Sequence, residues 1–169
     1  MNDPFFIGLD SKDPARVVLG TVFKSYTVQL RNASVQYVSG GSGPAIIFLH
    51  GFPQDWYEFG QVMRLLADRY TVIAVDLRGI GKSKATRAGY DAKTLATEIH
   101  ELADQLAINN PYIVGHDMGG MIAYAYARLY RLFRPERRLL NLLPVMGAFS
   151  ALPLTRGHDA PLIVVFPLP

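Results

Sequence analysis

The sequence contains no cysteine among its 169 residues. This absence excludes a disulfide framework, a thiolate metal site and a cysteine nucleophile. Long apolar runs are also missing, since no uninterrupted stretch approaches the roughly 18 residues that a membrane helix requires. The N-terminal stretch lacks the basic segment and long apolar segment of a secretory signal. We therefore expect a cytoplasmic location and no membrane partner.

Charged residues are few, and positive charges only slightly outnumber negative ones. Charged residues make up 18% of the chain, the net charge is +3, and most of the basic residues are scattered over the first 130 positions. No basic stripe carries interleaved aromatic residues, so nucleic acid is not an expected partner. Half of the residues are hydrophobic, which at this length predicts one globular domain with a sizeable core. Nothing in the pattern predicts a cofactor or a metal.

Apolar runs alternate with amphipathic segments over much of the chain. Strands buried on both faces are predicted at residues 45–49 (AIIFL), 71–75 (TVIAV) and 111–114 (PYIV). Helices are predicted over residues 56–68, 92–107 and 118–130. Before them, residues 26–30 and 33–38 alternate as a β-hairpin. The expected fold is α/β: a mostly parallel sheet with flanking helices, led in by an antiparallel hairpin.

The stretch GHDMG places Asp117 between the third apolar run and a predicted helix. Small residues two positions before and after a central nucleophile are typical of a sharp strand-to-helix turn, where larger side chains would collide. The N-terminus of the following helix favours negative charge at this turn. An aspartate that merely caps the helix is the alternative explanation. The turn alone does not show whether Asp117 is a nucleophile or a helix cap.

A second motif favours chemistry at Asp117. His50-Gly51-Phe52-Pro53 ends the apolar run at 45–49 abruptly. A loop at this place supplies one backbone N–H to an oxyanion, and the residue after the nucleophile supplies another. These donors are predicted to be Phe52 and Met118. We interpret His50 as a loop-packing residue and not as a base. The predicted supporting residues of the two motifs are His50, Gly51, Pro53, Gly115, His116 and Gly119.

With these two motifs in order, the chain resembles the α/β-hydrolase superfamily, and within it the epoxide hydrolases and their haloalkane and haloacetate dehalogenase relatives. The resemblance covers residues 24–130 and is carried by HGFPQDWYEF, YTVIAVDLRGIGKS and YIVGHDMGGMIAYAYA. It implies that the Asp117 carboxylate attacks an sp³ carbon and forms an alkyl–enzyme ester. A triad histidine would then activate water against that ester. The implied substrate is a small hydrophobic epoxide or a halogenated compound.

The residues beside the two motifs favour an epoxide. Haloalkane dehalogenases usually carry halide-donating Asn and Trp side chains where this chain has Phe52 and Met118. Fluoroacetate dehalogenases usually carry an Arg after the nucleophile. Neither Phe52 nor Met118 has a side-chain donor. The leading prediction is an epoxide-hydrolase-like enzyme, and the alternatives are a dehalogenase-like hydrolase and a non-catalytic degenerate fragment.

Two further patterns have simpler explanations. Gly81-Lys82-Ser83 resembles the end of a phosphate-binding loop, but that motif needs a glycine where this chain has Asp76. Nucleotide binding is therefore not expected. Asp76, at the end of a predicted strand, is interpreted as a carboxylate that stabilises the loop and not as a catalytic acid.

The composition changes after Tyr130. Residues 131–169 contain six of the eleven prolines, five arginines and no lysine. His158 is the one histidine after Asp117, and it comes too early to match the triad histidine of the resembled family. We expect residues 1–130 to be the N-terminal part of a hydrolase core, and residues 131–169 an atypical tail produced by a frameshift or truncation. The further expectations are no sustained turnover and self-association through an uncovered edge of the strand at 111–114.

Overall fold

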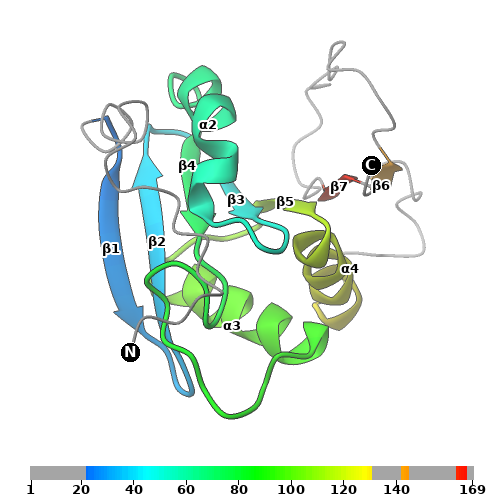
Figure 1. Ribbon diagram of the computed structural model, residues 1–169. Helices are drawn as coiled ribbons and strands as arrows, with labels where there is room; N and C mark the ends of the chain where they lie inside the picture. Colours follow the sequence, from blue (N-terminus) through cyan, green and yellow to red (C-terminus); the bar gives the residue numbers. More distant parts are fainter. Residues whose placement is uncertain (1–21, 131–141, 145–162, 167–169) are drawn as a thin grey trace.

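The computed structural model describes residues 22–130, 142–144 and 163–166. Seven strands form one sheet with the order β1-β2-β4-β3-β5-β7-β6 (Figure 1). The strands are β1 (Lys24–Gln29), β2 (Ser34–Gly40), β3 (Ala45–Leu49), β4 (Thr71–Val75), β5 (Tyr112–His116), β6 (Leu142–Pro144) and β7 (Ile163–Phe166). The helices are the 3-10 turn η1 (Trp56–Phe59), α2 (Gly60–Leu66), α3 (Ala92–Gln105) and α4 (Met118–Leu129).

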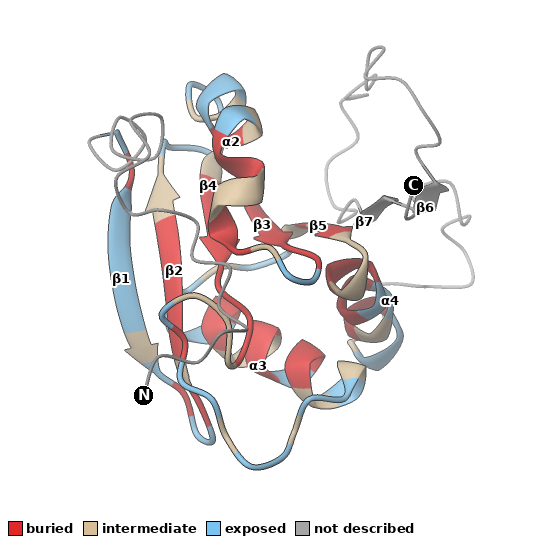
Figure 2. Cartoon of the chain, viewed as in Figure 1, coloured by how far each residue is buried: buried red, intermediate tan, exposed pale blue. Residues whose placement is uncertain are grey.

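The sheet is parallel except where the hairpin joins it. Strands β1 and β2 pair antiparallel, and β2 also runs antiparallel to β4. From β4 onward every neighbouring pair is parallel. The outer strand β1 is largely exposed, whereas the central strands are buried (Figure 2). The predicted α/β class and the leading hairpin are therefore confirmed.

Helices cover both faces of the sheet, and strand alternation decides which side chain meets which helix. In β3, Ile47 and Leu49 belong to the cluster that packs against α3 and α4. Ile46 and Phe48 belong to the opposite cluster, which includes residues of η1 and α2. Successive side chains of a strand point to opposite faces, so a continuous apolar run is needed where both faces are covered. Figure 1 shows α2 on one side of the sheet and α3 with α4 on the other.

The predicted helices differ from the observed ones mainly at their ends. The helix expected at 56–68 begins as the 3-10 turn η1 and becomes α-helical at Gly60. Asp55 caps η1, since its carboxylate accepts the Tyr57 N–H at 2.9 Å. Helix α3 is capped by Asp91, which accepts the Thr94 N–H at 3.0 Å. Such side-chain caps satisfy backbone donors that have no partner inside the helix.

One expectation about the sheet is wrong. The strand at 111–114 was predicted to have an uncovered edge, but β5 pairs in parallel with β7 from Ile113 to His116. The sheet therefore continues past β5 through β7 to β6. Self-association through a sheet edge stays a prediction. His158 and most of the 131–169 tail lie outside the described residues.

Candidate active site

The two motifs meet because β3 and β5 are parallel neighbours. Leu49 at the end of β3 pairs with Gly115 near the end of β5. Parallel strands end at the same edge of a sheet. The loop 50–53 that follows β3 and the turn 115–119, which begins in the last residues of β5, therefore lie side by side. Open parallel sheets bind ligands at this carboxyl edge.

Asp117 occupies a strained backbone position at the tip of its turn. Its φ is +50° and its ψ is −116°, outside the conformations that L-residues ordinarily adopt. Such positions cost about 1–3 kcal/mol and persist only where the surroundings enforce them. The Asp117 side chain makes no capping hydrogen bond to α4. Helix capping, the alternative explanation of this aspartate, is therefore not its role.

Two glycines make the turn possible. A Cβ on Gly115 would lie 2.3 Å from the Gly119 carbonyl oxygen, and one on Gly119 would lie 1.9 Å from the Leu49 carbonyl oxygen. Both obstacles are backbone atoms, which cannot move aside as a side chain can. The small residues predicted at these positions are thus required by close backbone approach.

The Asp117 carboxylate points across to the loop after β3. Its Oδ2 accepts the Phe52 backbone N–H at 3.0 Å. Gly51 permits this approach, because a Cβ there would lie 2.8 Å from the Asp117 Cβ. The Phe52–Pro53 peptide is cis, and the Phe52 side chain is exposed. Met118, which begins α4, is half-buried. The chain thus brings Asp117 to one of its two predicted backbone donors.

His50 ties the ends of two strands together beneath this loop. Its ring is fully buried, Nδ1 lies 2.7 Å from the Gly51 carbonyl oxygen, and Nε2 accepts the Leu77 N–H at 3.0 Å. Both ring nitrogens are engaged when Nδ1 carries the proton. Burial lowers the pKa of His50 below its ordinary value. These are the contacts of a loop-packing residue.

Because His50 is buried and neutral, we expect the free energy of unfolding to fall in mild acid. Because its folded-state pKa lies below the ordinary 6.5, the unfolded chain takes up a proton first as the pH falls below 6.5. The contribution of neutral His50 is complete above that pH and declines below it, with a slope of up to about 1.4 kcal/mol per pH unit. Urea unfolding at several pH values measures this slope. The His50→Gln variant should show a shallower slope below pH 6.5, and an unchanged slope would contradict the assignment.

Asp76 stabilises the loops around the site. Its Oδ1 accepts the Trp56 N–H and its Oδ2 accepts the Lys82 N–H, both at 3.0 Å. A Cβ on Gly81 would lie 2.1 Å from the same carboxylate, which explains a glycine in the sequence that resembled a phosphate-binding loop. The predicted loop role of Asp76 agrees with these contacts.

Glu58 is a site residue that the sequence motifs did not identify. Its Oε2 accepts the Gly51 N–H at 3.1 Å, and its Oε1 lies 2.5 Å from Nδ1 of His116. It therefore joins η1 to the loop after β3 and to the last residue of β5. No spacing rule indicates this contact, since residues 51, 58 and 116 meet only through the order of the strands.

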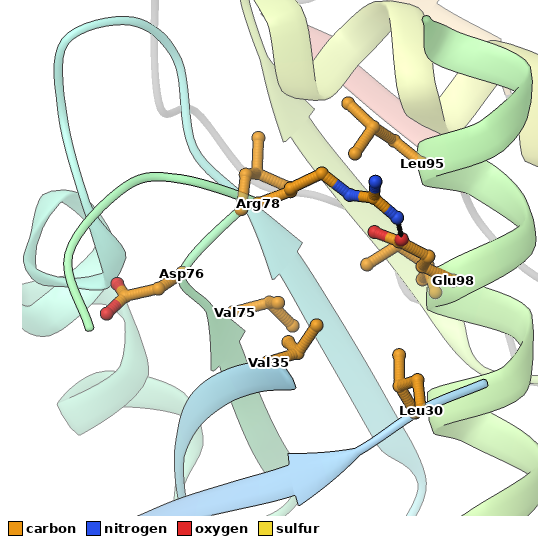
Figure 3. A pocket seen from close by; sticks show the side chains of 9 residues that line it. Leu30, Val35, Val75, Asp76, Arg78, Leu95 and Glu98 are labelled. Carbon is orange, nitrogen blue, oxygen red and sulfur yellow. Dashed lines mark hydrogen bonds and ion pairs between the residues drawn. The ribbon is translucent and has the colours of Figure 1, made fainter. Parts of the chain in front are cut away.

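Two hollows are lined by residues that the structure describes. One of them has a volume of about 10 Å³ and lies beside the buried Arg78–Glu98 ion pair. The Asp76 carboxylate is directed away from that pair (Figure 3). Such a volume suits about one water molecule. A hollow of about 600 Å³ lies at the opposite end of the strands, where Ala45 and Thr71 begin β3 and β4. Neither space is a substrate pocket at Asp117.

Two absences apply to the described part of the chain. Among residues 22–130 and the two short strands, no cluster of three or more His, Cys, Asp or Glu side chains is arranged to hold a metal ion. In the same residues, no helix combines the length and apolarity required to cross a membrane.

Comparison with known proteins places the chain in a family. Residues 44–142 match the family model described as alpha/beta hydrolase fold. A soluble epoxide hydrolase from Corynebacterium sp. (strain C12) is 36% identical over 126 residues, which are 75% of this chain and 44% of that protein. A fluoroacetate dehalogenase from Burkholderia sp. is 37% identical over 137 residues, or 76% of this chain and 44% of that protein.

Solved structures agree with these matches. The ligand-free structure of the epoxide hydrolase CorEH superposes with a TM-score of 0.63 at 38% identity, covering 64% of this chain and 38% of that one. The family and fold predicted from the two motifs are thereby confirmed. The chain spans less than half the length of the curated relatives it matches.

Proposed function

The chain belongs to the alpha/beta hydrolase fold family, and from this membership we propose that Asp117 is a carboxylate nucleophile that opens a small hydrophobic epoxide. The observation that carries the proposal is the geometry of its turn. Asp117 sits in a strained conformation at a strand-to-helix junction, with Oδ2 held by the Phe52 N–H at 3.0 Å. A residue held in strain without a capping role is a candidate for chemistry.

The first proposed step is alkylation. With Oδ2 held by Phe52, the second carboxylate oxygen, Oδ1, attacks an epoxide carbon, and the bond from that carbon to the epoxide oxygen breaks. The released alkoxide takes a proton from water, and the product is a hydroxyalkyl ester of Asp117. A carboxylate needs no deprotonation by histidine for this attack.

The second proposed step is hydrolysis of the ester. Its carbonyl oxygen is Oδ2, which already lies at the Phe52 N–H. Water attack on the carbonyl carbon places negative charge on this oxygen, where Phe52 and the predicted second donor, the Met118 N–H, stabilise it. The water must lose a proton to a general base. His50 is packed against Gly51 and Leu77, and His116 contacts Glu58, so we do not assign either of them as that base.

The described residues thus support the first step better than the second. We propose that this chain is alkylated at Asp117 and does not turn over steadily. Dehalogenation remains the second candidate, because a fluoroacetate dehalogenase is among the relatives. Phe52 and Met118 favour the epoxide, since neither side chain offers a donor to a halide or a carboxylate.

Intact-protein mass spectrometry distinguishes these candidates. We expect incubation with styrene oxide to add the mass of one styrene oxide molecule to the chain. Incubation with chloroacetate, whose chloride would be displaced, should leave the mass unchanged or modify it far more slowly. An adduct that forms faster with chloroacetate would favour the dehalogenase, and no adduct with either compound would overturn the nucleophile assignment.

A further inference from the structure

Glu58 connects the two motifs of the site from a third element. Its side chain rises from η1, which follows the loop 50–53 by two residues. One carboxylate oxygen accepts the Gly51 N–H at 3.1 Å, and the other lies 2.5 Å from His116 Nδ1. The first contact is a hydrogen bond, whereas the second has the distance of an ion pair without the geometry of a hydrogen bond.

The two partners of Glu58 directly precede the two residues that meet at the site. Gly51 precedes Phe52, whose N–H holds the nucleophile, and His116 precedes Asp117. A shift of either partner would therefore move the Phe52 N–H relative to the Asp117 carboxylate. Gly51 and His116 are in close contact, since a Cβ on Gly51 would lie 2.9 Å from His116 Nδ1. The Glu58 carboxylate thus contacts both sides of the tightly packed contact between Gly51 and His116.

Glu58 is itself held in a fixed place. Its backbone N–H donates to the Asp55 carbonyl oxygen at 3.1 Å, and the flanking turn is anchored by the buried rings of Trp56 and Phe59. The Glu58 side chain is 19% exposed and that of His116 is 21% exposed. The hydrogen bond from the Gly51 N–H to the ionised Glu58 carboxylate is charge-assisted, and such bonds are stronger than neutral ones.

We propose that Glu58 is a positioning residue that fixes the Gly51–Phe52 peptide against the Asp117 turn. The inference rests on the function proposed above and adds to it the group that sets the distance between nucleophile and backbone donor. Glu58 touches no reacting atom and acts through Gly51 and His116. Misplacement of a reacting group by about 1 Å can cost about 100-fold in rate, so loss of this contact should reduce alkylation without changing the nucleophile.

Three variants test the inference. Glu58→Ala removes both contacts. Glu58→Gln keeps an acceptor for the Gly51 N–H but removes the charge opposite His116. The matched control is Glu101→Ala, since Glu101 accepts the Arg31 N–H at 2.8 Å in another part of the molecule. The readouts are amide hydrogen exchange of Gly51 and Phe52 by NMR, the melting temperature, and the rate of adduct formation with styrene oxide.

For Glu58→Ala we expect Gly51 and Phe52 amide exchange to accelerate about 10-fold or more, because the Gly51 N–H loses its acceptor and the adjoining Phe52 N–H is then held less firmly against Asp117. The maximal alkylation rate should fall about 10-fold or more, while the half-saturating styrene oxide concentration changes little. Glu58→Gln should recover slow Gly51 exchange and part of the rate. Glu101→Ala should match the original protein in both.

Two results would overturn the inference. Unchanged amide exchange in Glu58→Ala would show that Glu58 does not hold the loop, and this readout decides the question even where the original chain forms no adduct. Faster exchange with an unchanged alkylation rate would reduce Glu58 to a purely structural role. An original chain that forms no adduct would overturn the proposed function instead, so the two failures are distinct.

Discussion

Replacing Asp117 with asparagine is expected to abolish covalent capture of styrene oxide. The amide has nearly the same shape, and its oxygen can still accept the Phe52 N–H that now meets Oδ2 at 3.0 Å. It lacks the negative charge that makes the carboxylate a nucleophile. The free energy of unfolding should change by less than about 1 kcal/mol, because the contact is retained. Intact mass and urea unfolding of the same samples measure both quantities.

The control for this variant is Asp104→Asn. Asp104 lies on α3, and its side chain is 66% exposed. If styrene oxide modified carboxylates indiscriminately, this change would reduce labelling about as much as the change at Asp117. We expect Asp104→Asn to label like the original chain. Persistent labelling of Asp117→Asn at the original rate would contradict the assignment.

Replacing Glu98 with alanine is expected to destabilise the fold more than a surface substitution. Glu98 pairs with Arg78 (Figure 3), and the two side chains are 8% and 4% exposed. The Arg78 Nη1 also donates to Thr86 Oγ1 and to the Ala88 carbonyl oxygen, both at 2.6 Å. These bonds hold the guanidinium in place, so the Arg78 charge stays buried after its partner is removed. Breaking a buried pair by removing one member typically costs about 3–5 kcal/mol.

Urea unfolding measures this effect against two comparisons. Glu101→Ala, on the same helix, should cost about 1 kcal/mol or less. Changing both members, Arg78→Met with Glu98→Leu, should recover a large part of the loss, because no uncompensated charge stays buried. A Glu98→Ala variant as stable as Glu101→Ala would show that the pair is not enclosed as described.

Local patterns in the sequence were enough to predict the central fold. The runs at 45–49 and 71–75 became β3 and β4 with the same bounds, because a strand covered on both faces needs apolar residues in succession. The Asp117 turn was equally predictable. Gly115 is required by a backbone atom within the turn itself, the Gly119 carbonyl oxygen. Constraints of this kind leave a signature within a few residues.

Contacts between distant segments left no such signature. Glu58 and His116 are 58 positions apart and meet because β3 lies beside β5. The place of β7 beside β5, which corrected the predicted open edge, likewise depends on pairing across a long separation. The bounds of η1 were missed because Asp55 and Asp76 hold the backbone around Trp56 in a tighter turn than helical spacing indicates. Such features can be identified only from the three-dimensional arrangement of the strands and loops.

The most direct test of the central claim is tandem mass spectrometry of the chain after reaction with styrene oxide and proteolysis. We predict a single hydroxyalkyl ester, located on Asp117 within the peptide that joins β5 to α4. Esters on Asp55, Asp76 or Glu58 in place of Asp117, or a peptide left unmodified, would contradict it.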